Sequence, residues 1–283
     1  MADNRILRDY DAENGIVRLT INNPERRNAY DPAMREQLAA FLDDAAADDD
    51  VKVVHLRGAG GVFSTGADMG NAYSWYGAGK ADERRPSQRR RLAVDRRTFS
   101  FYHNFIGFPK VTVAEVAGYA LGGGFELALA ADIAVVARDT RIGMPATRFL
   151  GPALGSLHLF FYRLGPVLAR RLLLTGDIIE AGELEGRGIF TEITDAAHVA
   201  DRAARWALKA SRMPADGIVI AKEAFRMVEQ LQAYHGEEVF SYLTHAYGTN
   251  LRFEPGEFNF VKARAEYGTK EAFRMRDRHF HVD

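Results

Sequence analysis

The sequence predicts an α/β protein with a helical region at its C-terminal end, and two observations carry this prediction. Up to about residue 200, short β-rich runs alternate with glycine-containing turns and amphipathic helical segments. From about Asp195 onward, apolar residues recur at helical spacing only. We therefore expect a sheet-containing core over 1–200. A helical region over 201–283 would cover the core or a neighbouring subunit.

The composition excludes several classes of protein and site. A formal net charge of −1 gives no global attraction to nucleic acid or to an anionic membrane. The chain has no cysteine, which rules out disulfides, thiolate metal sites and a cysteine nucleophile. The one long apolar stretch, 111–137, carries three acidic residues and a glycine triplet, so we expect it to lie in protein and not in lipid. Together with a charged N-terminus that lacks a signal-peptide core, this predicts a cytoplasmic protein.

The first elements follow from local patterns. Residues 15–21 alternate between apolar and polar side chains and predict a strand. Asp31 followed by Pro32 is a strong helix start, with a capping carboxylate and a proline at the first helical position. This helix should run to about Ala47 and bury Met34, Leu38, Phe41 and Leu42. A second buried strand is expected over 51–56.

Residues 63–69, FSTGADM, combine a strand, a glycine-containing turn and a helix start. Such a turn presents backbone N–H groups, notably that of Ala67, where a ligand could bind. Asp68 is expected to cap or brace the turn. The simpler interpretation is an ordinary left-handed turn at Gly66.

Residues 71–100 hold three aromatic residues and seven arginines. One or two of the arginines could bind the phosphates of an anionic substrate, since guanidinium groups suit phosphate well. For most of them we favour a surface helix with a solvated basic face. The aromatic residues are Tyr73, Trp75 and Tyr76, and the arginines are Arg84, Arg85, Arg89, Arg90, Arg91, Arg96 and Arg97.

Residues 111–137 read VTVAEVAGYALGGGFELALAADIAVVA and predict a strand over 111–116, a glycine-rich turn and a helix. The glycines Gly122, Gly123 and Gly124 allow a sharp turn and a close approach of backbone N–H groups to a ligand. The helix start favours negative charge, and Glu126 in its first turn could act as a base. Alternatively, the glycines only pack the helix tightly on the sheet, and Glu126 is solvated.

The remaining elements are expected in a simple order. A loop over 142–149 leads to an apolar segment, 154–164, and to a helix over 167–174 that ends at Thr175–Asp177. A short helix over 179–185 and a strand over 188–193 follow. The C-terminal helices are expected over 196–210, 214–233, 237–247, 255–265 and 269–275.

The combination of these segments resembles the crotonase (enoyl-CoA hydratase/isomerase) superfamily. The resemblance rests on NNPERRNAY, FSTGADM, AEVAGYALGGGFELALAADI, LLLTGDIIEAGE followed by GRGIFTEI, and EFNFVKARAEYGTKEAFRMRDRHF, in this order. It covers essentially the whole chain. It implies a crotonase fold, a superhelix of repeated ββα units with a C-terminal helical region, and a homotrimer or a dimer of trimers.

The resemblance also implies roles for individual residues. The amides of Ala67 and Gly123 would form an oxyanion hole for the carbonyl of a coenzyme A thioester, and Glu126 would be the general acid/base. Coenzyme A would enter as part of the substrate, with no separate cofactor and no metal. The residues expected to bind substrate and coenzyme A are Arg26, Arg27, Ser64, Thr65, Gly66, Asp68 and Gly122.

The chain departs from the hydratases of this family at one position. Their second glutamate would follow the proline of the loop that here reads GMPATRF, and this chain has Ala146 there. A missing proton-transfer group typically costs roughly 10²–10⁴ in rate. A site with one carboxylate suits proton transfer between two carbons, as in an enoyl-CoA isomerase.

Several alternatives remain open at this point. Hydration could proceed with a water in the second role, or with Arg148, His158 or Tyr162 leaning into the pocket, although a guanidinium cannot act as a base. The same oxyanion hole could serve hydrolysis or decarboxylation. A protein of another class would keep the fold without catalysis and bind coenzyme A, or bind RNA through the arginine-rich segment. Trp75, Phe99 and Phe105 are candidates for the wall of the acyl pocket.

Overall fold

The structure is a computed structural model that describes residues 5–71, 87–150, 156–231, 234–248 and 253–281. Tyr73, Trp75, Tyr76, Arg84 and Arg85, singled out above, lie outside the described residues. No helix among the described residues is both long enough and apolar enough to cross a bilayer.

Parallel pairing dominates the larger of the two described sheets. It contains β1 (Ile6–Asp11), β2 (Ile16–Ile21), β3 (Val53–Gly58), β4 (Val111–Val116), β6 (Ile133–Ala137) and β9 (Glu192–Thr194) in this spatial order. β1 is antiparallel to β2, and every later pair is parallel. A smaller sheet joins β5 (Tyr119–Leu121), β7 (Arg141–Gly143) and β8 (Ile178–Glu180).

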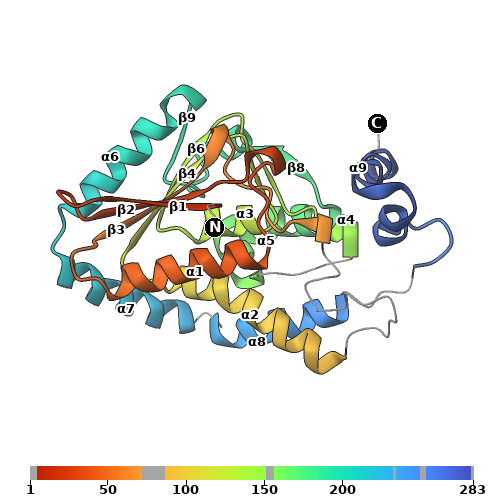
Figure 1. The fold of residues 1–283 in the computed structure, drawn as a ribbon, viewed down its shortest axis with the longest axis horizontal. Coiled ribbons are helices and arrows are strands. Elements are labelled where there is room, and N and C mark those ends of the chain that lie inside the picture. The colour runs from red at the N-terminus through yellow and green to blue at the C-terminus, as the bar shows by residue number, and fades with distance from the viewer. Residues whose placement is uncertain (1–4, 72–86, 151–155, 232–233, 249–252, 282–283) are drawn as a thin grey trace.

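The larger sheet is buried on both faces. Successive side chains of each strand point to opposite sides of the sheet, so neighbouring residues belong to different clusters. In β3, Val53 packs in a cluster with α6 (Val199–Ser211), whereas Val54 packs in the main core on the other face. That main core includes Met34, Leu38 and Leu42 of α1 (Pro32–Ala47), and it also holds apolar residues of α2 (Gln88–Ile106), α3 (Gly123–Ala130) and α5 (Leu157–Thr175). Figure 1 shows α6 above the sheet and α1 and α2 below it.

The C-terminal region is helical, as expected. It comprises α7 (Ala215–Leu231), α8 (Tyr234–Gly248) and α9 (Phe260–Phe280) after α6. α8 packs along α2, and α9 packs against α4 (Thr147–Leu150) at the end of the molecule away from α6 (Figure 1). A small cluster of Phe149, Phe260, Ala263 and Ala272 anchors α9 there.

Several predicted elements are confirmed by the structure. Asp31 caps α1, since its side chain accepts a hydrogen bond from Met34 N at 2.9 Å, and Ala47 ends the helix. β4 covers 111–116, as predicted. Of the four α1 residues expected in the core, Phe41 is only partly buried at its edge.

Other predictions were wrong. β1 was missed, because it is an edge strand in which three of the six side chains are charged and four of the six residues are exposed. The helix expected over 179–185 is β8 followed by a single 3₁₀ turn, Ala181–Leu184, and the strand expected over 188–193 shortens to β9. In contrast, the two separate helices expected over 255–265 and 269–275 are confirmed as the two parts of α9, which begins later than expected, at Phe260, and breaks where Gly268 adopts a positive φ of 79°.

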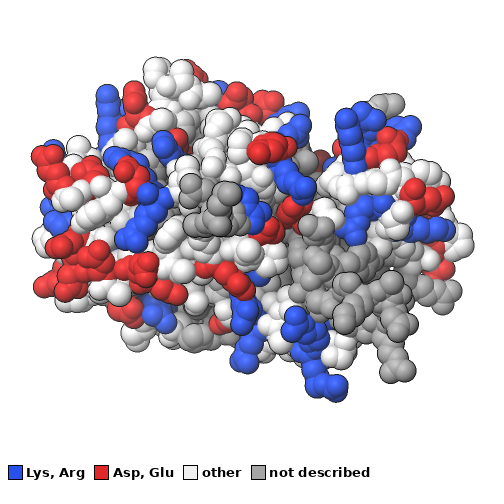
Figure 2. All heavy atoms as spheres, viewed as in Figure 1, with Lys and Arg blue, Asp and Glu red and all other residues white. Residues whose placement is uncertain are grey.

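Charged side chains of both signs intermix over the face shown in Figure 2. The arginine-rich part of α2 has Arg89, Arg90, Arg96 and Arg97 exposed to solvent. One of them, Arg97, pairs with Glu36 of α1 at 3.1 Å. Among the described residues, the face shown therefore carries no continuous basic surface of the kind that nucleic-acid binding requires.

Candidate active site

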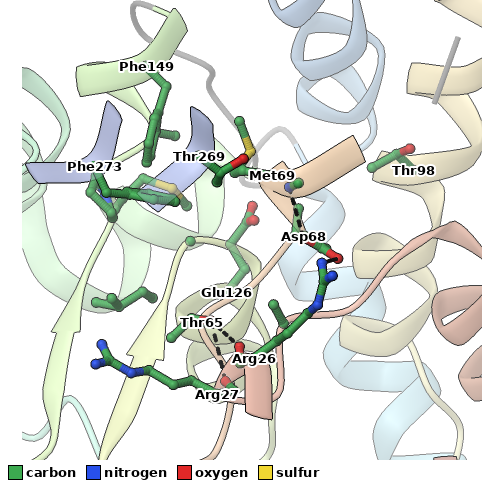
Figure 3. Close-up of a pocket in the computed structure, with 18 of the residues that line it drawn as sticks. Arg26, Arg27, Thr65, Asp68, Met69, Thr98, Glu126, Phe149, Thr269 and Phe273 are labelled. Atoms are coloured by element: carbon green, nitrogen blue, oxygen red, sulfur yellow. Dashed lines mark hydrogen bonds and ion pairs between the residues drawn. The ribbon is translucent and has the colours of Figure 1, made fainter. Parts of the chain in front are cut away.

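A pocket of about 910 Å³ opens where the two glycine-containing turns meet α2, the 144–149 loop, and α9. Figure 3 shows Glu126 at its centre, with Phe149 and Phe273 on one side and Asp68 and Arg26 on the other. A pocket of this size matches the range of small-molecule sites in proteins.

The first turn is held by backbone pairing on both sides. Ser64 N donates to Tyr119 O at 2.9 Å, and Leu121 N donates to Ser64 O at 3.0 Å. At the next bridge, Tyr30 N donates to Gly66 O and Asp68 N donates to Tyr30 O, both at 2.9 Å. Because the groups flanking Ala67 face Tyr30, the amide of Ala67 itself points the other way.

The two turns touch each other, and only glycine fits where they do. Gly66 has φ of +81°, and a Cβ on it would lie 2.6 Å from Leu121 O and 2.8 Å from Gly123 N. A Cβ on Gly124 would overlap Ser64 O. Gly122 also has a positive φ, 55°, and its N–H donates to Gly143 O at 3.0 Å. The amides of Ala67 and Gly123 are thereby brought to the same place.

Neither of these two amides has a protein acceptor among the residues that the structure describes. Ala67 and Gly122 line the pocket, and Gly123 lies directly behind them at the start of α3. An amide in the first turn of a helix has no partner within the helix and carries the positive end of the helix dipole. The arrangement can therefore stabilise negative charge on a bound oxygen.

Glu126 is the carboxylate nearest to this point along α3. Its side chain is buried, with 4% of the residue exposed, and Oε1 accepts a hydrogen bond from Ser156 N at 2.9 Å. The bond fixes the carboxylate relative to the N-terminus of α5. The interpretation of Glu126 as a solvated helix residue is therefore wrong.

A pair of buried tyrosines lies against the same helix start. The hydroxyls of Tyr30 and Tyr102 are 2.5 Å apart, and a Cβ on Gly123 would overlap both. Burial raises the pKa of both phenols, and the charge of Glu126 acts in the same direction, whereas Arg35 lowers both. Both phenols are therefore neutral donors at neutral pH, and Tyr102 and Arg35 line the pocket.

Charged residues gather where the pocket meets solvent. Arg26 pairs with Asp68 at 2.6 Å, and Asp68 also accepts from Gly70 N at 2.8 Å, so Asp68 braces the turn as expected. Arg27 lies over the ring of Tyr119 at 4.8 Å. Thr65 donates to the backbone oxygens of Arg27 and Arg26 at 3.3 and 3.4 Å.

Some of the predicted site residues do not reach the pocket. Ser64 is fully buried: its hydroxyl donates to Asn28 O at 2.7 Å and accepts from Gly66 N at 3.0 Å, so it supports the turn from behind. Arg148 turns away to Thr175 O and Asp177. His158 stacks on Tyr162 along α5, outside the pocket wall. None of these last three can replace a second glutamate here.

The 144–146 segment borders the pocket as the sequence predicted, with Met144, Pro145 and Ala146 all in its wall. Phe99 also lines it, whereas Phe105 is in the core. Tyr30, Tyr102, Asp95 and His245 were missed. Their signal was weak: Tyr102 and His245 stand among aromatic residues that read as core, Asp95 stands among arginines, and Tyr30 only precedes a helix start.

No cluster of three or more potential metal ligands occurs among the described residues. The carboxylates and the imidazole that line the pocket, among them Asp68, Asp95, Glu126 and His245, do not gather into such a cluster.

Comparison with known proteins identifies the family. A sequence profile described as enoyl-CoA hydratase/isomerase matches residues 11–268. The chain belongs to the enoyl-CoA hydratase/isomerase family. This confirms the resemblance to the crotonase superfamily.

Individual relatives agree with the profile. The chain is 29% identical to 2,3-dehydroadipyl-CoA hydratase of Escherichia coli, over 78% of this chain and 82% of that protein. It is also 29% identical to 1,2-epoxyphenylacetyl-CoA isomerase of the same organism, over 77% and 80% of the two chains. An enoyl-CoA hydratase/isomerase from Xanthobacter autotrophicus Py2 superposes with a TM-score of 0.80 at 30% identity, covering 98% of this chain and 99% of that one. The protein therefore has the crotonase fold.

The contact between Gly123 and the two tyrosines gives a testable prediction. Gly123→Ala should lower the free energy of unfolding by about 1–3 kcal/mol, the usual cost of forcing a methyl group into a packed site. In a Tyr30→Phe/Tyr102→Phe background, part of this cost should disappear because both hydroxyls are gone. Urea unfolding of the four proteins in this cycle measures the coupling. Additive effects would contradict the packing described here.

Proposed function

We propose that the protein transfers a proton between carbons of an acyl-CoA thioester, through an enolate held in the pocket. Its family supports a coenzyme A thioester substrate, since the two named relatives are an acyl-CoA hydratase and an acyl-CoA isomerase. The single observation that carries the proposal is the juxtaposition of one buried carboxylate, Glu126, with two turns whose amides converge, beside a loop that offers Ala146 and no second carboxylate.

The amides of Ala67 and Gly123 would hold the thioester oxygen. Removing a proton next to a thioester carbonyl places negative charge on that oxygen. Fixed donors in a pocket that excludes water stabilise this charge without reorganisation, and losing one such donor typically costs roughly 10²–10³ in rate. The contact at Gly66 favours this role, because it fixes the distance between the two turns.

Glu126 would take the proton and return it. The bond from Ser156 N restricts its carboxylate to one orientation, and its place in the first turn of α3 puts it one helical turn beyond Gly123. A single base that removes a proton from one carbon and delivers it to another performs an isomerisation. Hydration needs a second group to handle water, and Ala146 has no such group.

Tyr102 is the strongest addition to this machinery. Its phenol lines the pocket, and Tyr30 supports it from behind at 2.5 Å. Two phenols share one proton in their mutual hydrogen bond, which leaves the other proton for a further acceptor. Because burial raises the pKa of both groups, Tyr102 would act as a donor to the enolate oxygen and not as a base.

Coenzyme A would bind across the charged edge of the pocket. Of the two arginines singled out from the sequence, Arg26 is paired with Asp68, whereas the guanidinium of Arg27 lies over the ring of Tyr119. We propose that Arg27 binds the phosphates of coenzyme A, whereas Arg26 stabilises the turn through its ion pair with Asp68. Thr65, Gly66 and Gly122 would flank the pantetheine arm.

Assembly into a homotrimer or a dimer of trimers is part of the same proposal. α7 exposes Ile220, Phe225, Met227, Val228 and Leu231, each at least 54% accessible in the single chain. An apolar face of this kind on a soluble helix is normally covered by another surface. A cytoplasmic location fits a chain without cysteine.

The role of Glu126 can be tested by proton exchange. Wild-type protein should incorporate deuterium from D₂O at the α-carbon of 3-butenoyl-CoA and convert it to the 2-enoyl thioester. Glu126→Gln should slow both by roughly 10²–10⁴, the usual contribution of a proton-transfer group, with unchanged thioester affinity. Mass spectrometry and ultraviolet absorbance follow the two events.

Two results of this experiment would contradict the proposal that Glu126 transfers the proton. An equally active Glu126→Gln protein would remove Glu126 from the chemistry. Coenzyme A thioester binding with no exchange in the wild type would indicate a binding protein that keeps the fold without catalysis.

The place of Ala146 gives a second prediction. Ala146→Glu should raise the rate of crotonyl-CoA hydration at least about tenfold, since it restores a second proton-transfer group. Ala146→Gln is the matched control, with nearly the same size and no base. Equal rates in the two variants would mean that position 146 does not limit hydration.

A further inference from the structure

The wall between α2 and α8 holds a second group of polar side chains that the proposed proton transfer does not use. Asp95 Oδ2 lies 3.1 Å from His245 Nδ1, with side-chain exposures of only 3% and 14%. Both residues line the same pocket as Glu126. Burying a carboxylate costs free energy unless it is paired. A buried Asp95–His245 pair in the wall of a substrate pocket is therefore a candidate for binding substrate.

The position of this pair relative to the reacting end follows from α2. Asp95, Thr98, Phe99 and Tyr102 all line the pocket, at the spacing of one helix face. Seven residues separate Asp95 from Tyr102, which is about 10 Å along the axis. Tyr102 contacts Gly123, so the Asp95–His245 pair lies about two turns from the thioester. The rings of His245 and Phe99 pack edge to face with their centroids 5.1 Å apart, which restricts the orientation of the imidazole.

Two side chains of this group present hydrogen-bond acceptors. The Thr98 hydroxyl donates its proton to Val94 O at 2.9 Å, so toward the pocket its oxygen can only accept. The carboxylate of Asp95 offers oxygen lone pairs. The imidazole of His245 accepts or donates according to its tautomer. In Figure 3, Thr98 lies across Glu126 from Phe149 and Phe273.

The opposite polarity prevails at the reacting end. There the amides of Ala67 and Gly123, the phenol of Tyr102 and the guanidinium of Arg35 are donors. The influence of Arg35 on the pKa of both tyrosines places its charge at that end. The pocket thus runs from donors at the thioester to acceptors two helical turns away.

We propose that Asp95, Thr98 and His245 form a subsite for a hydroxyl group on the acyl chain, which makes the substrate a hydroxylated acyl-CoA thioester. This rests on the proposed function, since it assumes that the thioester lies at Gly123 and Glu126. A hydroxyl donates to the carboxylate or the imidazole. A carboxylate on the acyl chain is disfavoured, because it would face the charge of Asp95 at close range. An aromatic ring carried two carbons beyond the carbonyl places a para hydroxyl at a suitable distance.

Three saturated thioesters with one skeleton test the subsite by calorimetric titration. They are 3-phenylpropanoyl-CoA, its 4-hydroxyl derivative and its 4-carboxyl derivative. The hydroxylated thioester should bind wild-type protein roughly tenfold more tightly than the parent, the effect of one good hydrogen bond. His245→Phe and Thr98→Val should each bring this ratio toward one without weakening the parent compound.

Ser100→Ala provides the matched control. Ser100 donates to Glu238 at 2.9 Å and so joins the same two helices, but it does not line the pocket. This variant should keep the tenfold ratio. If His245→Phe fails to fold, Thr98→Val carries the test, because it changes one hydroxyl to a methyl group of the same shape.

Equal binding of the parent and hydroxylated thioesters to wild-type protein would overturn the subsite, as would a ratio that survives both His245→Phe and Thr98→Val. Tighter binding of the carboxylated thioester would also overturn it and point instead to Arg35. Deuterium exchange at the α-carbon of the same compounds separates this proposal from the proposed function. Exchange without a hydroxyl preference removes only the subsite, whereas the absence of exchange from every thioester removes the proton transfer.

Discussion

The pocket depends on the contact between two turns that leaves no room for a side chain. Gly66 faces Leu121 O and Gly123 N, and Gly124 faces Ser64 O, so the chain at 64–67 and the start of α3 meet backbone to backbone. Asn28 secures this contact from the third side: its carbonyl accepts from Ser64 at 2.7 Å, and its side chain donates to Ala59 O at 2.8 Å. Because the closest atoms in the contact are main chain, the positions of the amides of Ala67 and Gly123 follow from the backbone of the two turns, which Ser64 and Asn28 support.

The rest of the pocket is arranged around that fixed point by charge. Positive ends and protons converge on it, from the start of α3, from Tyr102 and from Arg35. The carboxylate of Glu126 lies next to this contact between the two turns and accepts a hydrogen bond from Ser156 N. Acceptors are placed farther along α2, at Asp95 and Thr98. A thioester in this pocket would experience a gradient that stabilises an enolate at one end and binds a donor group at the other.

Local sequence patterns predicted much of the framework. The Asp31–Pro32 start, the strand at 111–116 and the two glycine turns were all predicted, because each is determined by neighbouring residues. The position of Glu126 beside the glycine turn was predicted as well, since its place three residues after Gly123 puts it in the first turn of the helix. The side-chain pairs that complete the pocket were not predicted. Tyr30 and Tyr102 are 72 positions apart, and Asp95 and His245 are farther still. Which face of α2 meets α1, α3 and α8 depends on packing across the whole core, and no short pattern specifies it. Arg148, His158 and Tyr162 failed as candidates for the same reason, because nearness in sequence to the 144–149 loop did not bring them to the pocket.

The most direct test of the central claim is the infrared carbonyl band of a bound thioester labelled with ¹³C at C1. We predict that binding to Glu126→Gln protein, which blocks turnover, moves this band to lower frequency than in water, because two amides polarise the carbonyl. Replacing Tyr102 with Phe should reduce the shift without abolishing it. A band at its solution frequency in the bound state would contradict the account, because it would mean that the amides of Ala67 and Gly123 do not hold the thioester oxygen.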